Sequence, residues 1–200
     1  MKYVIGIDEV GRGSLAGPVT VCALLWPQGQ VFRNTPRVKL NDSKKLSKRQ
    51  REDWSHYLKA HSAVHMELAS VSNKVIDKIN IAQATNLAAT RALGKIIANK
   101  NLKKSDIFIY LDGGLKLKKF NNFKIQTVIG GDAKIKVIMA ASIVAKVYRD
   151  RFMTNLDAKY PLYGFRENKG YGTEKHTKTI KLNGPSIHHR LTFLRKITIL

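Results

Sequence analysis

The segment KYVIGIDEVGRGSLAGPV, residues 2–19, is the part of the sequence that most restricts how the chain can fold. It opens with β-branched and aromatic residues in alternation, which predicts a β-strand. The strand ends at two adjacent acids, Asp8 and Glu9. A turn with three glycines follows around Arg12: Gly11, Gly13 and Gly17. We therefore predict a strand that carries carboxylates at its carboxyl end, beside a turn whose glycines let a ligand come close to the backbone.

Two adjacent acids are by themselves most often a solvated strand end. Successive strand residues face opposite sides, so Asp8 and Glu9 can serve one metal ion only if the backbone turns at Glu9, or if a carbonyl helps. The Val10–Gly11 step permits such a turn. The chain also has few acids to place, 14 against 36 basic residues, which favours a specific role for this pair.

The charge balance points to a polyanionic partner. The net charge is +22 over 200 residues, and the basic residues are spread along the whole chain. A surface of this kind suits nucleic acid, although a generally basic proteome explains part of such an excess.

The single cysteine, Cys22, lies in an apolar run and is expected to be a buried free thiol. No apolar run approaches the ~20 residues of a membrane span. The sequence enters a strand at once, which leaves no room for a signal peptide. These features lead us to expect a protein of the reducing cytoplasm.

The periodicity along the chain predicts an α/β fold with a mixed sheet. Further strands are expected at 19–26, 63–70, 106–111 and 124–129, with residues 30–32 pairing back as a hairpin. Helices are expected at 47–61 with a capping box, at 81–99 capped by Asn80, at 136–160, and as a short piece at 173–183. The buried side of the 136–160 helix should hold Ala140, Ile143, Val144, Val147 and Phe152. One domain spans 1–200, with a core at 1–160 and a small C-terminal helical lobe at 161–200.

Acids follow two more of the predicted strands, Asp112 before a glycine pair and Asp132 after one. Parallel strands bring their carboxyl ends together, and clustered carboxylates need cations to ionise together. Oxygen ligands suit Mg²⁺ or Mn²⁺, and no HxxxH or CxxC pairing argues for zinc. Divalent ions beside a basic surface suggest phosphodiester chemistry. The alternative is that strand ends simply tend to be polar.

Five motifs, in this order, resemble bacterial ribonuclease HII, the type-2 ribonuclease H: IDEVGRGSLAGPV, NDSKKLS, YLDGG, AASIVAKVYRD and KGYGT. The similarity extends from about Tyr3 to Phe193. It implies the ribonuclease H-like mixed sheet flanked by helices, and cleavage of RNA in RNA–DNA hybrids and at single ribonucleotides embedded in duplex DNA. It also implies a monomer that uses Mn²⁺ or Mg²⁺, cuts 5′ to the ribonucleotide, leaves a 3′-hydroxyl and a 5′-phosphate, and serves ribonucleotide excision repair and DNA replication.

The resemblance assigns roles residue by residue. It makes Asp8, Glu9 and Asp112 the metal ligands and Asp132 the fourth catalytic acid. The residues that read the RNA-to-DNA junction are then Gly11, Arg12, Gly13 and Tyr171. The expected phosphate contacts are Lys45, Lys146 and Arg149, and Lys44 lies in the same DSKKLS segment as Lys45.

The chain departs from the family pattern at three places, none of which removes a catalytic group. Ser14 stands where proline is usual, which would loosen the turn. Gly130 removes a lysine beside Asp132, and Thr192 replaces a serine.

Other groups allow two interpretations. Asp150 competes with Asp132 for the fourth acidic position, although an Arg-Asp neighbour in a helix is more often structural. His188 and His189 either contact phosphate or shuttle a proton, or they pack the lobe, and packing is favoured. Of Tyr160, Tyr163, Phe165 and Tyr171, most should belong to the core of the lobe, although aromatic rings also stack on bases.

Two other classes of function remain open at this point. A non-catalytic nucleic-acid binder would carry the same positive charge, but acids inside a cationic surface weaken binding unless a metal neutralises them. A resolvase or transposase-type nuclease would share the acids but should lack the GRG and KGY segments. Cleavage of a duplex with a single ribonucleotide in Mn²⁺ separates all three.

Overall fold

The computed structural model describes residues 2–30 and 35–195. Its centre is a five-stranded sheet in the order β3-β2-β1-β4-β5. The strands are β1 (Tyr3–Val10), β2 (Val19–Pro27), β3 (His65–Val71), β4 (Ile107–Asp112) and β5 (Lys124–Val128). β1 pairs antiparallel with β2 and parallel with β4, and β5 continues the parallel half, so the sheet is mixed as predicted.

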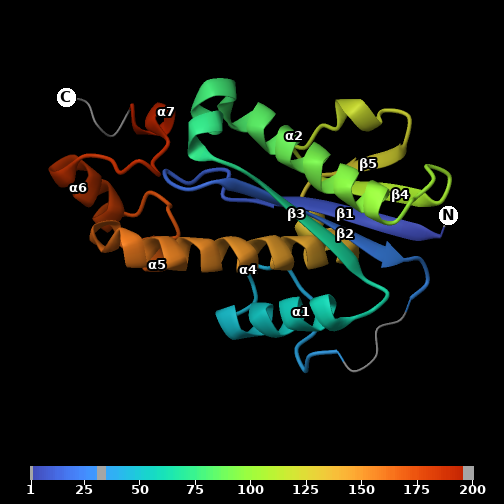
Figure 1. The fold of residues 1–200 in the computed structure, drawn as a ribbon. Helices are drawn as coiled ribbons and strands as arrows, with labels where there is room; N and C mark the ends of the chain where they lie inside the picture. Colours follow the sequence, from blue (N-terminus) through green and yellow to red (C-terminus); the bar gives the residue numbers. More distant parts are fainter. Residues whose placement is uncertain (1, 31–34, 196–200) are drawn as a thin grey trace.

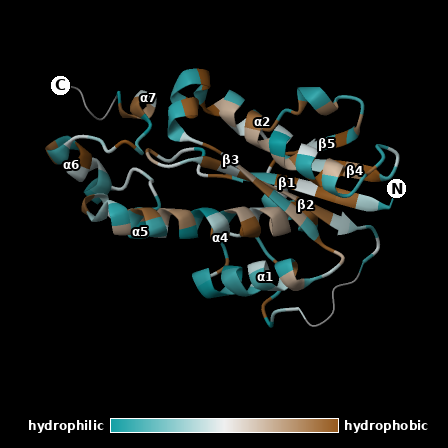
Figure 2. Ribbon diagram, viewed as in Figure 1, coloured by the Kyte–Doolittle hydropathy of each residue, from teal (hydrophilic) through white to brown (hydrophobic). Residues whose placement is uncertain are grey.

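Helices cover both faces of this sheet (Figure 1). One face carries α2 (Asn73–Asn99), and the other carries α4 (Lys136–Lys159) with α1 (Lys48–Ala60) packed against α4. This sandwich explains why β2 is apolar almost throughout: its residues are buried on both sides. By contrast α1 lies outermost and is mostly hydrophilic in Figure 2, and its buried apolar side chains are Trp54 and Leu58.

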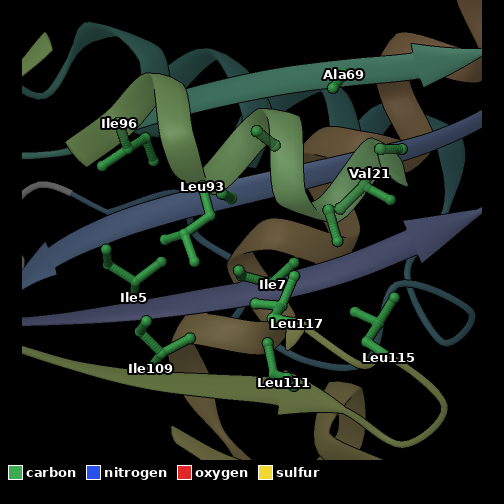
Figure 3. Packing of buried hydrophobic residues seen from close by; sticks show 14 of the residues in the cluster. Ile5, Ile7, Val21, Ala69, Leu93, Ile96, Ile109, Leu111, Leu115 and Leu117 are labelled. Atoms are coloured by element: carbon green, nitrogen blue, oxygen red, sulfur yellow. The ribbon is translucent and has the colours of Figure 1, made fainter. Parts of the chain in front are cut away.

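The core between α2 and the sheet is shown in Figure 3. There Leu93 and Ile96 of α2 pack over Ile5 and Ile7 of β1 and over residues of the neighbouring strands. A second cluster lies on the opposite face, where α4 contributes Ile143 and Val144. The central strand is thereby held rigidly from both sides up to the acids at its end.

Local sequence signals place the helix starts. Ser47 and Gln50 form the predicted capping box of α1. Asn80 accepts a hydrogen bond from the Gln83 N–H at 3.0 Å, which confirms it as the cap of the predicted helix 81–99. The structure adds about two helical turns before it, residues 73–79, and joins the two pieces at Asn80, which has φ 65° and ψ 166°. Asparagine tolerates this left-handed φ better than most residues.

The C-terminal part consists of short helices: η2 (Pro161–Tyr163), α5 (Phe165–Asn168), α6 (Glu174–Asn183) and α7 (Leu191–Leu194). α6 begins after Thr173 and ends at Asn183, just before Gly184, as predicted. A separate apolar cluster joins these helices to the end of α4 and to the glycine turn through Leu15, Met153 and Phe165. The remaining short elements are η1 (Lys118–Phe120) and α3 (Gly131–Lys134).

Two predictions of local structure need comment. Phe152 is 37% exposed rather than buried, because it falls on the side of α4 that no other layer covers, whereas the other four predicted residues are buried. The hairpin predicted at 30–32 falls largely outside the described residues, and Gln30 itself is not in a strand. Among the described residues, no helix combines the length and apolarity needed to cross a membrane.

Candidate active site

The acids meet because β1 and β4 run parallel. The register pairs Ile7 with Leu111, so Asp8 and Asp112 stand side by side one position further on. Oxygen atoms of Asp8, Glu9 and Asp112 all lie within 4.8 Å of one another. The expected backbone turn at Glu9 is absent, since β1 continues its pairing with β2 as far as Val10. The carboxylates therefore converge through their side chains, not through a break in the strand.

The electrostatics of this cluster favour a bound cation. Burial raises the pKa of Asp8 well above its ordinary value, the charges of Glu9 and Asp112 raise it further, and a hydrogen bond from Ser142 opposes them. Burial likewise raises the pKa of Glu9, against the effect of Arg12, whose Nη1 lies 3.4 Å from Glu9 Oε1.

Glu9 Oε2 gives an independent indication that the cluster binds a cation. It is buried and has no hydrogen-bond partner within the described part of the chain. A buried carboxylate oxygen is rarely left without a partner. An all-oxygen set with one free atom fits Mg²⁺ or Mn²⁺.

Asp112 and Asp132 are positioned by one short glycine segment. The Gly131 N–H donates to Asp112 Oδ1 at 2.7 Å, and a Cβ on Gly131 would lie 2.5 Å from Ile138 Cδ1. Asp132 follows in α3, is nearly buried, and accepts a hydrogen bond from Lys44 Nζ at 2.9 Å. Gly131 therefore links the acid at the end of β4 to the segment that carries Asp132.

These acids line one cleft of about 510 Å³. Its walls bring together the glycine turn, the segment after residue 42, and one side of α4: Gly11, Arg12, Gly13, Ser43, Lys44, Arg51, Ser142, Lys146 and Tyr171. Asp132 lies in this cleft, whereas Asp150 pairs with Lys146 at 2.9 Å and lines a separate groove. The geometry thus favours Asp132 over Asp150 as the fourth acid.

Two expected phosphate contacts are placed differently from the prediction. Arg149 is fully buried, and its guanidinium donates to four protein oxygens, so in this structure it lies behind the cleft wall and not on the surface where a phosphate contact was expected. The physical reason is that α4 turns this residue under the glycine turn. Lys45 is exposed but does not line the cleft, and Lys44 takes that position.

Several residues of the site region were not predicted from the sequence. Ser142 and Ser43 share a hydrogen bond of 3.0 Å behind Asp8. Arg190 lies fully buried behind the glycine turn. Ser14, expected to loosen that turn, is buried and donates to the Gly11 carbonyl at 2.8 Å. The histidine interpretation that favoured packing is confirmed for His189, which is 1% exposed against His176.

The comparisons with known proteins agree with this geometry. Residues 5–196 match the family model described as Ribonuclease HII. The chain is 43% identical to "Ribonuclease HII" of Endomicrobium trichonymphae over 95% of its length and 84% of the relative's, and 42% identical to that of Pelagibacter ubique over 96% of both. Among solved structures, ribonuclease H2 from Pyrococcus horikoshii OT3 superposes with a TM-score of 0.69 at 26% identity, covering 98% of this chain and 96% of that one. The chain belongs to the ribonuclease HII family and is a ribonuclease H hydrolase.

Proposed function

We propose that this ribonuclease H, beyond the cleavage of RNA–DNA hybrids that its family supports, cuts duplex DNA on the 5′ side of a single embedded ribonucleotide. The products are a 3′-hydroxyl and a 5′-phosphate. The observation that carries the proposal is the cleft itself, in which the three acids face the glycine turn and Tyr171 across one space. A non-catalytic binder has no use for these acids, and a resolvase has no use for that turn.

The chain would hold two divalent ions, Mn²⁺ or Mg²⁺, through Asp8, Glu9 and Asp112, with Asp132 as the fourth acid. Bound there, the ions supply an activated water and neutralise the charge that develops on the leaving 3′ oxygen. Asp8 is held for this task by Ser142, and Asp112 by the Gly131 N–H. Both carboxylates therefore have their orientation set before substrate arrives.

Basic residues at the rim hold the substrate by its phosphates. Lys146 and Lys44 reach into the cleft, and Arg51 lies on its far wall. Contacts of this kind give affinity without base sequence preference. Substrate identity then depends on the 2′-hydroxyl, which is the group that distinguishes RNA from DNA.

The junction is read between the glycine turn and Tyr171. The Tyr171 ring is 36% exposed, and it packs on Arg149, whose Cζ lies 5.6 Å from the ring centroid, with Lys146 Nζ at 6.0 Å. Gly170 beside it leaves no room for a Cβ, since the Ala16 carbonyl oxygen would lie at 2.6 Å, so this backbone packs directly on the glycine turn. In the proposal the ring stacks on the deoxyribose after the ribonucleotide and excludes a further 2′-hydroxyl.

The test uses a duplex with one ribonucleotide and a hybrid with continuous RNA, both in Mn²⁺. The parent cuts both, and Tyr171→Ala loses the cut at the lone ribonucleotide while its melting temperature stays near that of the parent. Tyr171→Phe, which keeps the ring, serves as the matched control. A parent that never cuts the lone ribonucleotide, or a Tyr171→Ala variant whose cleavage falls only in step with stability, contradicts the proposal.

We further propose that the enzyme works as a monomer in the cytoplasm. The reducing conditions there suit Cys22, which is fully buried in the sheet as a free thiol.

A further inference from the structure

Two arginines, Arg149 and Arg190, are fully buried directly behind the glycine turn. We propose that they are positioning residues that lock the turn so that its N–H groups face the substrate. The inference rests on the proposed function of the turn, and it adds a second layer of residues that this function needs.

Arg190 donates hydrogen bonds to three backbone carbonyls of the turn. Its Nη2 donates to the Gly11 carbonyl at 2.7 Å, its Nη1 to the Arg12 carbonyl at 2.9 Å, and its Nε to the Gly17 carbonyl at 3.0 Å. The residue comes from the start of α7, so the C-terminal part of the chain reaches into the site from behind. One planar guanidinium thus fixes both ends of the turn.

Arg149 holds the next part of the turn from α4. It donates to Ser14 Oγ at 2.8 Å, to the Ala16 carbonyl at 3.1 Å and to the Pro18 carbonyl at 3.2 Å. A fourth bond, 2.7 Å long, goes to the Lys169 carbonyl, next to the Tyr171 segment. Arg149 therefore ties the turn and the tyrosine segment to one another.

Neither guanidinium forms an ion pair with a carboxylate among the described residues. Two neighbouring buried cations without acids are costly, and each makes the other more so. Burial, followed by the charge of Arg149, lowers the pKa of Arg190 to about 9. An arginine side chain stays protonated in proteins, so both guanidinium groups carry a charge at neutral pH. A fold that needed only packing would place apolar side chains here, so the charge indicates a task at the turn.

The geometry of the peptide bond shows what that task is. In a trans peptide the C=O of one residue and the N–H of the next point in opposite directions. Because Arg190 draws the carbonyls of Gly11 and Arg12 inward, the N–H groups of Arg12 and Gly13 are directed away from it. Among the described residues neither N–H group donates to another backbone oxygen, and a Cβ on Gly13 would meet nothing within 4 Å. They are donors left open on the cleft side, backed by two positive charges.

The groups best suited to such donors are an oxygen of the substrate backbone and the 2′-hydroxyl of the ribonucleotide. A positioning arginine behind them acts without touching the substrate. It should therefore alter which substrate is cut, and how fast, without altering the number of phosphate contacts.

The test replaces Arg190 by lysine, which keeps the charge but cannot donate to all three carbonyls in the same geometry. Two readouts are taken: the ¹⁵N–¹H shifts of the Arg12 and Gly13 amides without substrate, and kcat and KM on the lone ribonucleotide and on continuous hybrid. The matched control is Leu93→Ala, a change in the core between α2 and the sheet that should also lower the melting temperature. Arg190→Lys should move both amide signals and lower kcat on the lone ribonucleotide by about 10²-fold, well beyond the control.

The slope of log affinity against log salt should be unchanged in Arg190→Lys, since no phosphate contact is lost. A slope smaller by about 1 overturns the proposal in favour of a phosphate contact. Unmoved amide signals, or activity that falls only as far as in Leu93→Ala, also overturn it. The amide shifts need no cleavage, so they separate a failure of this inference from a failure of the proposed function.

If Arg190→Lys does not fold, Ser14→Ala tests the same proposal through the contact that Arg149 makes with the turn. It leaves both arginines in place and removes the hydroxyl between Arg149 and the Gly11 carbonyl. The Arg12 and Gly13 signals should move in this variant too, and a parent-like spectrum with parent-like kcat contradicts the proposal.

Discussion

Lys44 Nζ lies 2.9 Å from Asp132 Oδ2, so a flexible lysine places its charge on the fourth acid of the cleft. The residue two positions before that acid is Gly130, so the positive charge beside Asp132 comes from Lys44. The hydrogen bond to Asp132 is the largest cause that raises the pKa of Lys44. The Lys44 side chain is mostly exposed, so this ion pair is weak. Asp132 can therefore exchange it for a metal ion, and Lys44 can exchange it for a phosphate.

Lys44→Ala should therefore change the metal dependence of cleavage. Without the lysine Asp132 is free to attract a cation, and half-maximal activity should be reached at a Mn²⁺ concentration lower by about 2- to 5-fold, as expected for loss of one exposed ion pair. Lys45→Ala is the matched control, because Lys45 is exposed outside the cleft. A Mn²⁺ titration of both variants checks this, and identical curves contradict it.

Asp8→Asn should nearly abolish cleavage while hybrid binding persists. Asparagine keeps the shape but removes the charge that holds the ion. In the metal-free protein the raised pKa of Asp8 means that the folded state gives up its proton less readily than the unfolded state, so stability is lost as pH rises above the ordinary value of 3.8. The variant escapes this loss, so its melting temperature in EDTA at pH 7 should exceed that of the parent, and Mn²⁺ should no longer raise it. Retention of most of the Mn²⁺-dependent rate would show the assignment to be wrong.

Lys146→Ala should weaken hybrid binding and reduce the slope of log affinity against log salt by about 1, with the cut position unchanged. Lys146 lines the cleft, and its Nζ donates a hydrogen bond to Asp150 Oδ1 at 2.9 Å. Fluorescence anisotropy at a series of salt concentrations measures the slope. Lys178→Ala, in α6 and outside the cleft, is the comparison, and equal slopes in the two variants would remove Lys146 from the phosphate contacts.

Gly11→Ala should be one of the most damaging single changes outside the acids. Gly11 has φ +83°, and a Cβ there would lie 2.1 Å from Arg149 Nε, so the substitution strains the backbone and displaces the buried arginine. Gly13→Ala is the control, since nothing lies within 4 Å of a Cβ at that position. We expect a loss of roughly 2 kcal/mol or more of unfolding free energy for Gly11→Ala and little for Gly13→Ala, measured by urea denaturation.

The histidine pair in the C-terminal part predicts a loss of stability in acid. The Ser186 N–H donates to His189 Nδ1 at 2.9 Å, so the proton of His189 is on Nε2, from which it donates to His176 Nε2 at 3.1 Å. His176 Nδ1 then donates to the Tyr171 carbonyl at 2.8 Å. An additional proton breaks this chain.

Burial, followed by the charge of His176, lowers the pKa of His189 from 6.5 to about 4. A lowered histidine pKa stabilises the fold fully above pH 6.5, and this contribution is lost as the pH falls from 6.5 toward 4. By linkage the loss reaches about 3 kcal/mol. Melting temperatures of the parent should therefore fall over this range more steeply than those of His189→Gln, and parallel curves contradict the assignment.

Much of the fold and of the acid site could be predicted because the signals were local. The alternation before Asp8, the capping residues Ser47 and Asn80, and the glycines beside Asp112 each act on their immediate neighbours. The parallel pairing of β1 with β4 could only be inferred, but once it is given, the meeting of Asp8 with Asp112 follows.

The buried arginines show where sequence interpretation fails. Nothing in the sequence around Arg149 distinguishes an arginine on the surface of a helix from one under a turn. The difference is made by Gly11, far away in the sequence, because a Cβ there would occupy the space that the Arg149 side chain fills. The sequence also does not distinguish Lys44 from its neighbour Lys45. The loop conformation decides that Lys44 lines the cleft and Lys45 does not.

The parallel pairing of β1 with β4 also has a consequence for the order of events during synthesis. Asp8 leaves the ribosome early, but its partner Asp112 follows about a hundred residues later, and the two meet only when β4 has docked beside β1 across the intervening α2. A nascent chain that ends before β4 therefore has no place to hold a divalent ion and no nuclease activity. A divalent ion held by these acids would bind only the completed sheet, so it would stabilise the finished enzyme without assisting the slow, long-range pairing that builds it.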